Sequence, residues 1–390
     1  MNEDENKISL MMITSFNDSK DIYIYDKGIS IEDAEVSGSF YFIRNKRGKI
    51  TKLYRQSDIN IQNGEVILFR TRKSKNKTLV IMNPINKNME KTNNNILNLN
   101  NKLWYVIKSE PNNHKFNNTE DYILNKNDII RFGNSTYEVI EKNIENINQK
   151  EKIEENKKIN QYDISNLNKN SQSIFKIIEI KNADYSNQNE NELCRICFDG
   201  ASSIDNPKLC LCNCKDYIHY ECLKNWIKTK IHKRTNYKKT VLSYSIKKFN
   251  CDVCLKHYPL KFKICGLDNE YSLIDLETPL GENYIVLESL WTSDGNNQKV
   301  FHIVKLIDEI ITFGRKDYCD IFDCSSFVSN THAIIKYNNK NGDVILENKN
   351  ANYDTLILVK DAVIIKRTKI YFQVGRTIIT AYLKKNTKNK

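Results

Sequence analysis

Paired cysteine and histidine residues between positions 194 and 254 constrain this chain more than any other feature. The pairs are CRIC at 194–197, CNC at 212–214, HYEC at 219–222 and CDVC at 251–254. Each pair closes a tight turn that directs two ligands at one ion, and two pairs complete a tetrahedral zinc site. We therefore expect structural zinc. The eight candidate ligands are Cys194, Cys197, Cys212, Cys214, His219, Cys222, Cys251 and Cys254.

Composition narrows the setting of these sites. The N-terminal stretch "MNEDENKISLMMITSF" lacks a basic start followed by an apolar run, and no apolar run in the chain is long enough to span a bilayer. We expect an intracellular protein, cytoplasmic or nuclear, whose reduced thiols bind metal. The net charge is +12, but the lysines are scattered through Asn-rich tracts. A scattered charge of this kind disfavours nucleic acid as a partner.

Changes in sequence texture predict the domain organisation. Short Tyr-, Ile- and Val-rich runs separated by Gly, Asn and Asp indicate β domains at 5–142 and 270–384, with the cysteine-rich segment at 191–265 between them. Residues 143–190 are charged and Asn-rich, which predicts a largely disordered or partly helical linker. Within that linker, "SIFKIIEI" at 173–180 could dock as a short strand.

The two β blocks share a weak internal sequence similarity, which we call the internal echo. The stretches "LNKNDIIRFGNSTYEVIEK" at 124–142 and "IIKRTKIYFQVGRTIITAYLKK" at 364–385 each have an apolar run, a glycine and an alternating strand. We therefore expect both blocks to end in the same hairpin and to share a sandwich topology.

The order of the cysteine and histidine pairs resembles that of the RING-CH (RINGv) finger, a relative of the RING and PHD fingers. The resemblance implies two interleaved zinc ions. One would be held by Cys194, Cys197, His219 and Cys222, and the other by Cys212, Cys214, Cys251 and Cys254. Two departures stand out: only "KDYI" separates Cys214 from His219, and the stretch from Cys222 to Cys251 is long. If Cys210 paired with Cys214 instead of Cys212, the spacing would be that of a PHD finger.

Fingers of the RING type bind a ubiquitin-conjugating enzyme and favour transfer from its thioester. The resemblance implies that Ile196, inside the first zinc loop, and Trp226, after the third pair, contact that enzyme, with Pro259 following the last pair. Trp226 also shares a helical face with Leu223, so a core position for its ring is an equal alternative.

The segment "FGRKDYCDIFDCSSFVSNTHAIIKY" at 313–337 resembles the centre of a forkhead-associated (FHA) domain, a β-sandwich whose loops bind phosphothreonine peptides. The resemblance implies that Arg315 and Ser329 hold the phosphate, that Asn330 and Thr355 also belong to the phosphopeptide-binding site, and that His332 braces the loop. The family's Asn-Gly before that threonine is replaced here by Tyr353 and Asp354.

Together these resemblances define the expected fold class and function. We expect a multidomain, mainly β protein with an N-terminal sandwich-like domain that is a degenerate FHA candidate, a small α+β cross-braced finger with two zinc ions, and an FHA-like C-terminal sandwich. The combination resembles a set of ciliate FHA/RING-CH proteins. The leading function is a RING-type ubiquitin ligase or ligase-like adaptor, which selects a phosphothreonine-containing partner. The alternative is a non-enzymatic zinc-binding scaffold or a PHD-like/FHA reader in a larger assembly, since no self-contained catalytic residues are evident.

Overall fold

The computed structural model describes most of the β-rich sequence and the finger. The described residues are 7–15, 29–53, 65–73, 79–83, 99, 101–108, 122–144, 177–181, 183–184, 192–214, 216–247, 249–290, 298–307, 310–349 and 351–384. The fold is mainly β, and α2 (Tyr220–Lys228) is the one helix within those ranges. Most of the expected linker at 143–190 lies outside the described residues.

An N-terminal lobe is built from two sheets packed face to face. One sheet has the order β26-β6-β5-β3-β4, and the other is the β7-β27-β28-β1-β2 part of a twelve-stranded sheet. Alternation along β1, where Ile8, Leu10 and Met12 are buried, turns one face of each strand inward. The strands of this lobe are β1 (Lys7–Ser15), β2 (Ile29–Val36), β3 (Phe40–Arg44), β4 (Ile50–Leu53), β5 (Val66–Lys73), β6 (Leu79–Met82), β7 (Trp104–Ile107), β26 (Val363–Ile364), β27 (Ile370–Val374) and β28 (Thr377–Lys384).

A C-terminal lobe repeats this arrangement. Its sheets have the orders β8-β24-β23-β21-β22 and β25-β9-β10-β19-β20, the second again being part of the twelve-stranded sheet. The core between them includes Phe132, Leu287, Phe313 and Leu346. The strands are β8 (Tyr122–Ile123), β9 (Ile129–Phe132), β10 (Ser135–Asn143), β19 (Tyr284–Ser289), β20 (Gln298–Lys305), β21 (Ile311–Gly314), β22 (Ile321–Phe322), β23 (Ala333–Asn338), β24 (Asp343–Asn348) and β25 (Thr355–Leu358).

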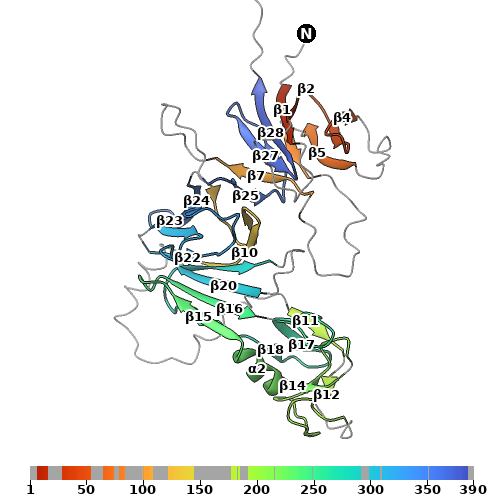
Figure 1. Cartoon of the computed structure of the whole chain (residues 1–390), viewed down its shortest axis with the longest axis vertical. Helices are drawn as coiled ribbons and strands as arrows, with labels where there is room; N and C mark the ends of the chain where they lie inside the picture. The colour runs from red at the N-terminus through yellow and green to blue at the C-terminus, as the bar shows by residue number, and fades with distance from the viewer. Residues whose placement is uncertain are drawn as a thin grey trace, which may run out of the picture.

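The two lobes exchange their last three strands. In chain order β8, β9 and β10 follow β7, yet they complete the C-terminal lobe; β26, β27 and β28 follow β25, yet they complete the N-terminal lobe. Figure 1 shows the blue β27 and β28 beside the red β1. The antiparallel pair β7–β25 joins the lobes, with Thr355 opposite Ile107. Each lobe is therefore a composite of both sequence blocks.

The shared hairpin expected from the internal echo is confirmed. Strands β9 and β10 form one antiparallel hairpin, β27 and β28 form the other, and the two occupy equivalent places in lobes of the same strand order. The ranges 5–142 and 270–384 remain predictions of sequence domains, because the packing units in space draw strands from both.

The finger packs on the outer side of the twelve-stranded sheet. Its core is continuous with sheet residues, since Leu223 and Ile227 of α2 share one buried cluster with Val286, Phe301 and Ile303. The long stretch between Cys222 and Cys251 is explained here: it forms α2 and then a hairpin that adds to the sheet through β20. The hairpin strands are β15 (Ile231–Thr235) and β16 (Val241–Lys247).

Two small sheets complete the finger. The first has the order β11-β17-β18 and the second β12-β13-β14. Strand β11 pairs in parallel with β17, so the expected docking of the segment at 173–180 as a strand is confirmed for its described part. These strands are β11 (Ile177–Ile180), β12 (Ala183–Asp184), β13 (Lys208–Leu209), β14 (Ile218–His219), β17 (Lys261–Ile264) and β18 (Glu270–Ser272). Among the described residues, no helix has the length and apolar character needed to cross a membrane.

Candidate metal centres and phosphate-binding loops

The structure brings the eight predicted ligands together in two separate groups of four. The ligand atoms within each group all lie within 4.8 Å of one another, and the groups alternate along the chain as a cross-brace requires. The first group is Cys194, Cys197, His219 and Cys222; the second is Cys212, Cys214, Cys251 and Cys254. The two donor sets are those of tetrahedral zinc.

A hydrogen bond fixes the orientation of the single histidine ligand. His219 Nε2 lies 2.5 Å from the carbonyl oxygen of Ala201, to which it donates, and Nδ1 lies 3.1 Å from Cys197 Sγ. The proton on Nε2 leaves the Nδ1 lone pair facing the thiols. A metal-binding imidazole is commonly held this way, with its other nitrogen bonded to a carbonyl.

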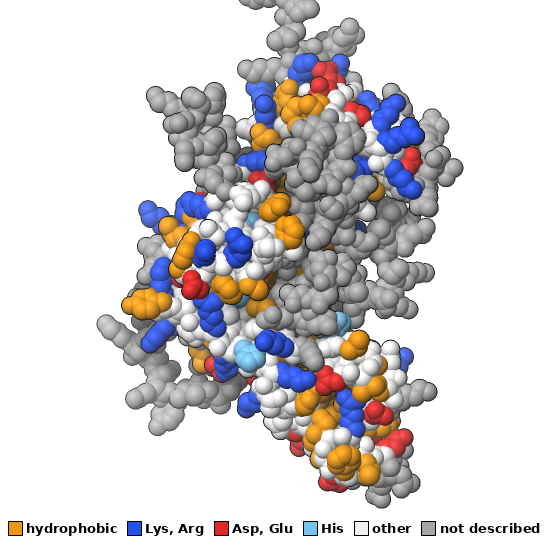
Figure 2. Space-filling view, in the orientation of Figure 1, with side chains coloured by type: hydrophobic (Ala, Val, Ile, Leu, Met, Phe, Trp, Pro, Cys, Tyr) orange, Lys and Arg blue, Asp and Glu red, His pale blue; other side chains and the backbone are white. Residues whose placement is uncertain are grey.

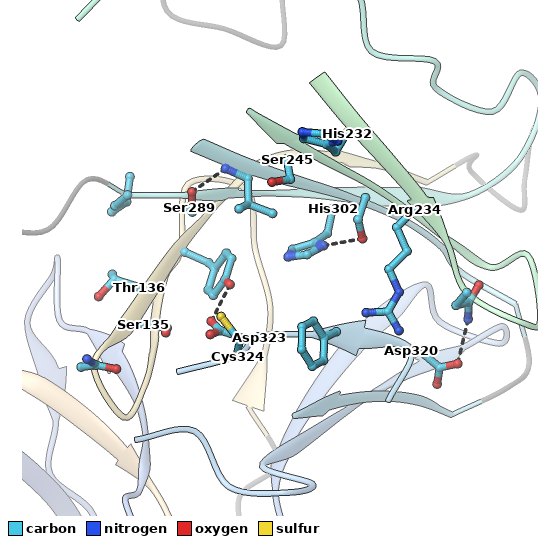
Figure 3. Close-up of a pocket in the computed structure, with 17 residues that line it drawn as sticks. Ser135, Thr136, His232, Arg234, Ser245, Ser289, His302, Asp320, Asp323 and Cys324 are labelled. Atoms are coloured by element: carbon cyan, nitrogen blue, oxygen red, sulfur yellow. Dashed lines mark hydrogen bonds between the residues drawn. The ribbon is translucent and has the colours of Figure 1, made fainter. Parts of the chain in front are cut away.

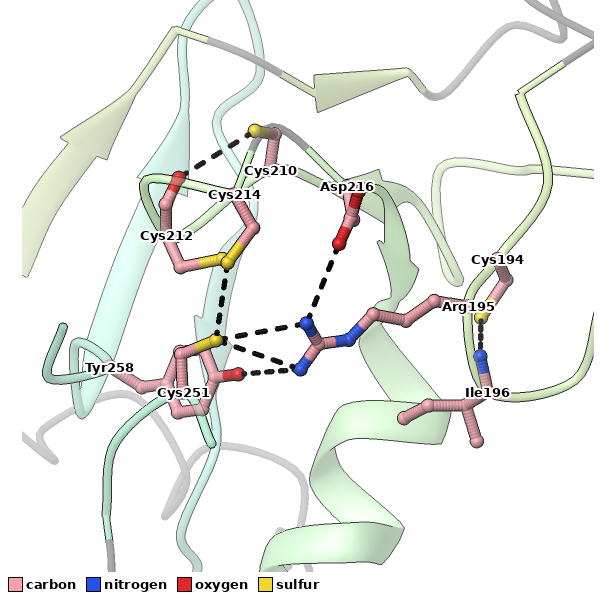
Figure 4. A network of polar contacts seen from close by, with 9 residues as sticks. All are labelled: Cys194, Arg195, Ile196, Cys210, Cys212, Cys214, Asp216, Cys251 and Tyr258. Atoms are coloured by element: carbon pink, nitrogen blue, oxygen red, sulfur yellow. Dashed lines mark hydrogen bonds and ion pairs between the residues drawn. The ribbon is translucent and has the colours of Figure 1, made fainter. Parts of the chain in front are cut away.

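Cys210 lies outside the second group. Its sulfur contacts the carbonyl oxygen of Cys212 at 3.9 Å, whereas Cys214 Sγ lies 3.7 Å from Cys251 Sγ (Figure 4). The backbone turn at 212–214 points Cys212 and Cys214 to the same side, toward Cys251. The pairing through Cys212 is therefore the one the fold assembles, and the PHD-like spacing through Cys210 is not formed.

Each group contains a thiol with a lowered pKa and a thiol with a raised pKa: Cys194 and Cys222 in the first group, and Cys251 and Cys214 in the second. Burial alone raises the pKa of Cys251, but backbone N–H groups of Cys254 and Val253 and the Arg195 guanidinium outweigh it and bring the pKa to about 6. Burial and neighbouring thiols raise the pKa of Cys214 to about 12. Protein groups alone thus leave part of each set protonated, and a divalent cation is what allows all the thiolates to coexist. The sites fit two zinc ions.

The two CxxC loops are structural twins. In the first, Phe198 N donates to Cys194 O and Cys194 N to Asp199 O; in the second, Leu255 N donates to Cys251 O and Cys251 N to Lys256 O. Phe198 and Leu255 both have φ of 61°. A bulky residue rarely adopts that conformation without a constraint, and here the closed loop supplies it.

The twin loops carry an exposed apolar patch. Ile196 and Val253 lie between the cysteines of their loops, Phe198 and Leu255 follow them, and all four are exposed, by 39%, 73%, 74% and 64% respectively. Figure 2 shows hydrophobic side chains gathered on the finger at the lower end of the molecule. Arg195 links the loops, since its guanidinium lies 3.7 Å from Cys251 Sγ. We call Ile196, Phe198, Val253 and Leu255 the zinc-loop patch; large apolar side chains clustered in this way on a surface are typical of a protein-binding site.

Trp226 is partly buried, so part of its ring belongs to the core of the finger and part is exposed. Its ring is partly buried against the finger core and meets Tyr258 edge-on at 6.3 Å, while Lys230 Nζ lies 3.3 Å from its centroid. Pro259, next to Tyr258, is half-buried.

Close approach of two loops forms the region around Arg315 and Ser329. A Cβ atom on Gly314 would lie 2.2 Å from the carbonyl oxygen of Asn330, so only glycine fits there. Arg315 N donates to Ser329 O at 2.9 Å, and Arg315 Nη2 reaches Asn330 Oδ1 at 3.5 Å. The exposed Arg315 and Asn330 and the half-buried Ser329 are thus held side by side, where they can share a phosphate through charge-assisted bonds.

The buried side chains of His332 and Thr355 support these loops from the core side. His332 is fully buried, accepts a hydrogen bond from Ser329 N at Nδ1 and has a pKa lowered by burial to about 4, so it is neutral. Thr355 is also fully buried, and its hydroxyl donates to Asn348 at 3.1 Å. In this arrangement Thr355 supports the loop from within the core. In the altered third motif, Asp354 pairs with Lys108, from the N-terminal block, at 2.6 Å.

A cavity of about 330 Å³ lies where the β9–β10 hairpin, the β15–β16 hairpin and strand β22 meet (Figure 3). His302 is fully buried at its wall, with Nδ1 2.8 Å from Ser243 Oγ, and burial lowers its pKa to about 4. Sequence reasoning passed over His302 and Arg195, because neither belongs to a spaced pair and both acquire their partners only in the folded chain.

Comparison with known protein families identifies two parts of the chain. The RING-variant domain model matches residues 194–254, and the FHA domain model matches residues 311–378. Comparisons with curated proteins and with solved structures gave no match. The first match covers both zinc groups, and the second covers the loops around Arg315 and Ser329. The chain therefore combines a RING-variant (RING-CH) domain with an FHA domain.

Proposed function

We propose that this protein is a RING-type ubiquitin ligase, or a ligase-like adaptor, that binds a ubiquitin-conjugating enzyme through its finger and a phosphothreonine-containing partner through its FHA loops. The RING-variant match supports the first role and the FHA match the second. Cysteines that bind zinc are typical of reducing compartments, and we place the protein in the cytoplasm or nucleus.

The zinc-loop patch carries the ligase proposal. A RING-type finger contributes no catalytic group of its own; it supplies a rigid apolar surface that a conjugating enzyme covers. The two twin loops supply four exposed apolar side chains, and the zinc ions hold the loops rigid. Trp226 of α2, whose ring contacts Tyr258, adds part of the helix to this surface. Rigid apolar anchors of this kind account for most of the binding energy at protein interfaces.

The loops around Arg315 carry the partner-binding proposal. Arg315 offers a planar guanidinium whose N–H groups match the geometry of a phosphate, and Ser329 and Asn330 lie beside it with polar side chains. A phosphate would receive donors from several side chains at once. The neutral His332 beneath them supports the loop without repelling or attracting the phosphate.

A ubiquitin-transfer assay tests the first role. The full chain with zinc bound is incubated with a panel of conjugating enzymes, and the variants Ile196→Ala and Val253→Ala are compared with Leu280→Ala, which removes an exposed leucine outside the finger. We expect each patch variant to lose about tenfold or more in transfer rate, as truncation of an interface anchor typically does, and Leu280→Ala to retain it. If the wild type transfers no ubiquitin with any enzyme, the scaffold alternative replaces the ligase.

A phosphopeptide titration tests the second role. Binding of peptides selected from a phosphothreonine library is measured for the wild type, for Arg315→Ala and for Lys340→Ala, which removes a charge in the turn between β23 and β24. We expect only Arg315→Ala to weaken binding, because only Arg315 lies beside Ser329. Equal affinity for phosphorylated and unphosphorylated peptides contradicts phosphate recognition.

A further inference from the structure

The two exchanged hairpins are equivalent residue by residue, which allows a direct comparison of their tips. In each, a two-residue turn begins with glycine in the left-handed region: Gly133 has φ of 61° and Gly375 has φ of 51°. The strand registers pair Phe132 with Ser135 and Val374 with Thr377, so Asn134 and Arg376 occupy the same turn position. The tips differ in their side chains and therefore in what they can bind.

The tip of β9–β10 rests against the loop that ends at Ser329. Asn134 Oδ1 accepts a hydrogen bond from Ser325 Oγ at 2.5 Å, and Ser325 Oγ in turn accepts one from Phe327 N at 3.3 Å. Val328 N donates to Ser325 O, which closes the turn leading to Ser329. Asn134 thus fixes the side chain around which this loop turns.

Neighbouring residues of the same hairpin make further contacts with the loop. A Cβ atom on Gly133 would lie 2.3 Å from the carbonyl oxygen of Phe327, so the hairpin backbone touches the loop backbone. The Tyr137 hydroxyl donates to Asp323 at 2.7 Å (Figure 3). The Phe132 ring meets the His332 ring edge-on at 5.5 Å.

The tip of β27–β28 forms hydrogen bonds with the N-terminal lobe. Arg376 donates to the carbonyl oxygen of Lys46 at 2.7 Å, and Arg44 donates to Thr377 Oγ1 at 2.7 Å. Arg44 is the last residue of β3, and Arg315 follows β21, the equivalent strand of the C-terminal lobe. Arg44 of the N-terminal lobe is therefore buried and bonded to the exchanged hairpin, whereas Arg315 is exposed.

We propose that the β9–β10 hairpin of the N-terminal block positions the phosphate-binding loop of the FHA domain, with Asn134 as the positioning residue. The proposal rests on the phosphopeptide function and adds a residue far outside the matched range 311–378. Affinity for a phosphopeptide then depends on residues of the N-terminal block as well as on Arg315 and Ser329.

Variants at the two equivalent turn positions test this proposal. In the full chain, Asn134→Ala removes the acceptor for Ser325, Asn134→Asp keeps an oxygen there, and Arg376→Ala is the matched change in the other hairpin. Loss of one hydrogen bond of about 1 kcal/mol predicts about fivefold weaker binding of a phosphothreonine peptide by Asn134→Ala. We expect Asn134→Asp to restore affinity and Arg376→Ala to leave it unchanged. If Arg376→Ala weakens peptide binding and Asn134→Ala does not, each hairpin stays in its own block and the proposal is overturned. Equal loss of affinity in Asn134→Ala and Asn134→Asp would also overturn it.

Cross-linking tests the exchange independently of phosphate binding. Lys384 of β28 forms an ion pair with Glu35 of β2, which exists only if β28 lies in the N-terminal lobe. A zero-length carbodiimide followed by mass spectrometry should join these two residues within one chain, alongside the control pair Lys305–Glu282, 3.0 Å apart within the last block. If the Lys305–Glu282 cross-link forms and the Lys384–Glu35 cross-link does not, the intramolecular exchange is contradicted. The exchange is also contradicted if, in a mixture of isotopically labelled and unlabelled protein, Lys384 and Glu35 are joined only between two different chains. A wild type that binds no phosphopeptide overturns both the function and the positioning role, and the cross-link then decides whether the exchange itself stands.

Discussion

The guanidinium of Arg195 lies 3.7 Å from the sulfur of Cys251, although 56 residues separate them in the chain. Arg195 stands between two ligands of the first zinc group, and Cys251 belongs to the second. Its guanidinium also lies 3.5 Å from the Tyr258 hydroxyl and 3.7 Å from Asp216 (Figure 4). One side chain thus ties both metal centres together and supports the zinc-loop patch.

We predict that Arg195→Ala weakens the second zinc site without removing a ligand. A group that hydrogen-bonds a metal ligand typically contributes about 10- to 100-fold to metal affinity. Competition with a chromogenic chelator should therefore show one of two zinc ions released more readily, while the other is held as in the wild type. Identical release curves for the variant and the wild type contradict this role.

Zinc content distinguishes Cys210 from Cys212. The wild type should contain two zinc ions per chain by elemental analysis, because both groups have four suitable donors. Cys210→Ser should keep both ions, and Cys212→Ser, its neighbour two residues on, should lose one. Loss of an ion from Cys210→Ser instead would restore the PHD-like pairing.

A methyl group at position 314 should separate the two loops that carry Arg315 and Ser329. Gly314→Ala places a Cβ atom 2.2 Å from Asn330 O, so the backbone around Asn330 must move. Overpacking of this kind costs about 1–3 kcal/mol, and phosphopeptide affinity should fall as well. Gly38→Ala is the control, because its Cβ atom meets only Phe40 at 3.6 Å. Denaturant melts and peptide titrations of both variants measure the difference; equal behaviour would refute the close approach.

Burial of His302 makes stability depend on pH. The folded chain protonates His302 only near its lowered pKa of about 4, whereas the unfolded chain does so near 6.5. The unfolded state therefore binds more protons between these values, and the free energy of unfolding falls as pH drops from 6.5 to 4, by up to about 3 kcal/mol. His302→Asn should lose that part of the pH dependence. The comparison uses urea midpoints of both proteins across this range, because acid release of zinc affects both alike; parallel curves would contradict the prediction.

Local sequence was sufficient to predict the metal ligands and most strands. The spacing of the cysteine and histidine pairs predicted the eight ligands, and the resemblance to the RING-CH finger predicted their division into two groups. The clusters contain Cys212 and not Cys210, as that resemblance implied. The resemblance to the FHA domain also predicted that His332 supports the loop at Ser329, and the hydrogen bond from Ser329 N to His332 Nδ1 agrees with that prediction.

The exchange of hairpins could not be predicted in this way. Alternation of apolar residues along 129–143 and 370–384 specifies a hairpin and its inner face but not the lobe that receives it. The two hairpins occupy equivalent places in lobes of the same strand order, so the strand pattern alone does not distinguish the lobes. The contacts that distinguish the lobes include Asn134 with Ser325 and Arg376 with Lys46, and they join residues 191 and 330 positions apart.

The exchanged strands also govern how the chain can fold while it is being made. Strands β1 and β2 leave the ribosome first, but β1 pairs with β28, and the Thr14 hydroxyl bonds to that of Thr377, 363 residues later, at 3.0 Å. At about 5–20 residues per second, the N-terminal strands wait on the order of tens of seconds for that partner. The N-terminal lobe can therefore be completed only after residue 384 has been made, whereas every strand of the C-terminal lobe is already present once the chain reaches residue 358.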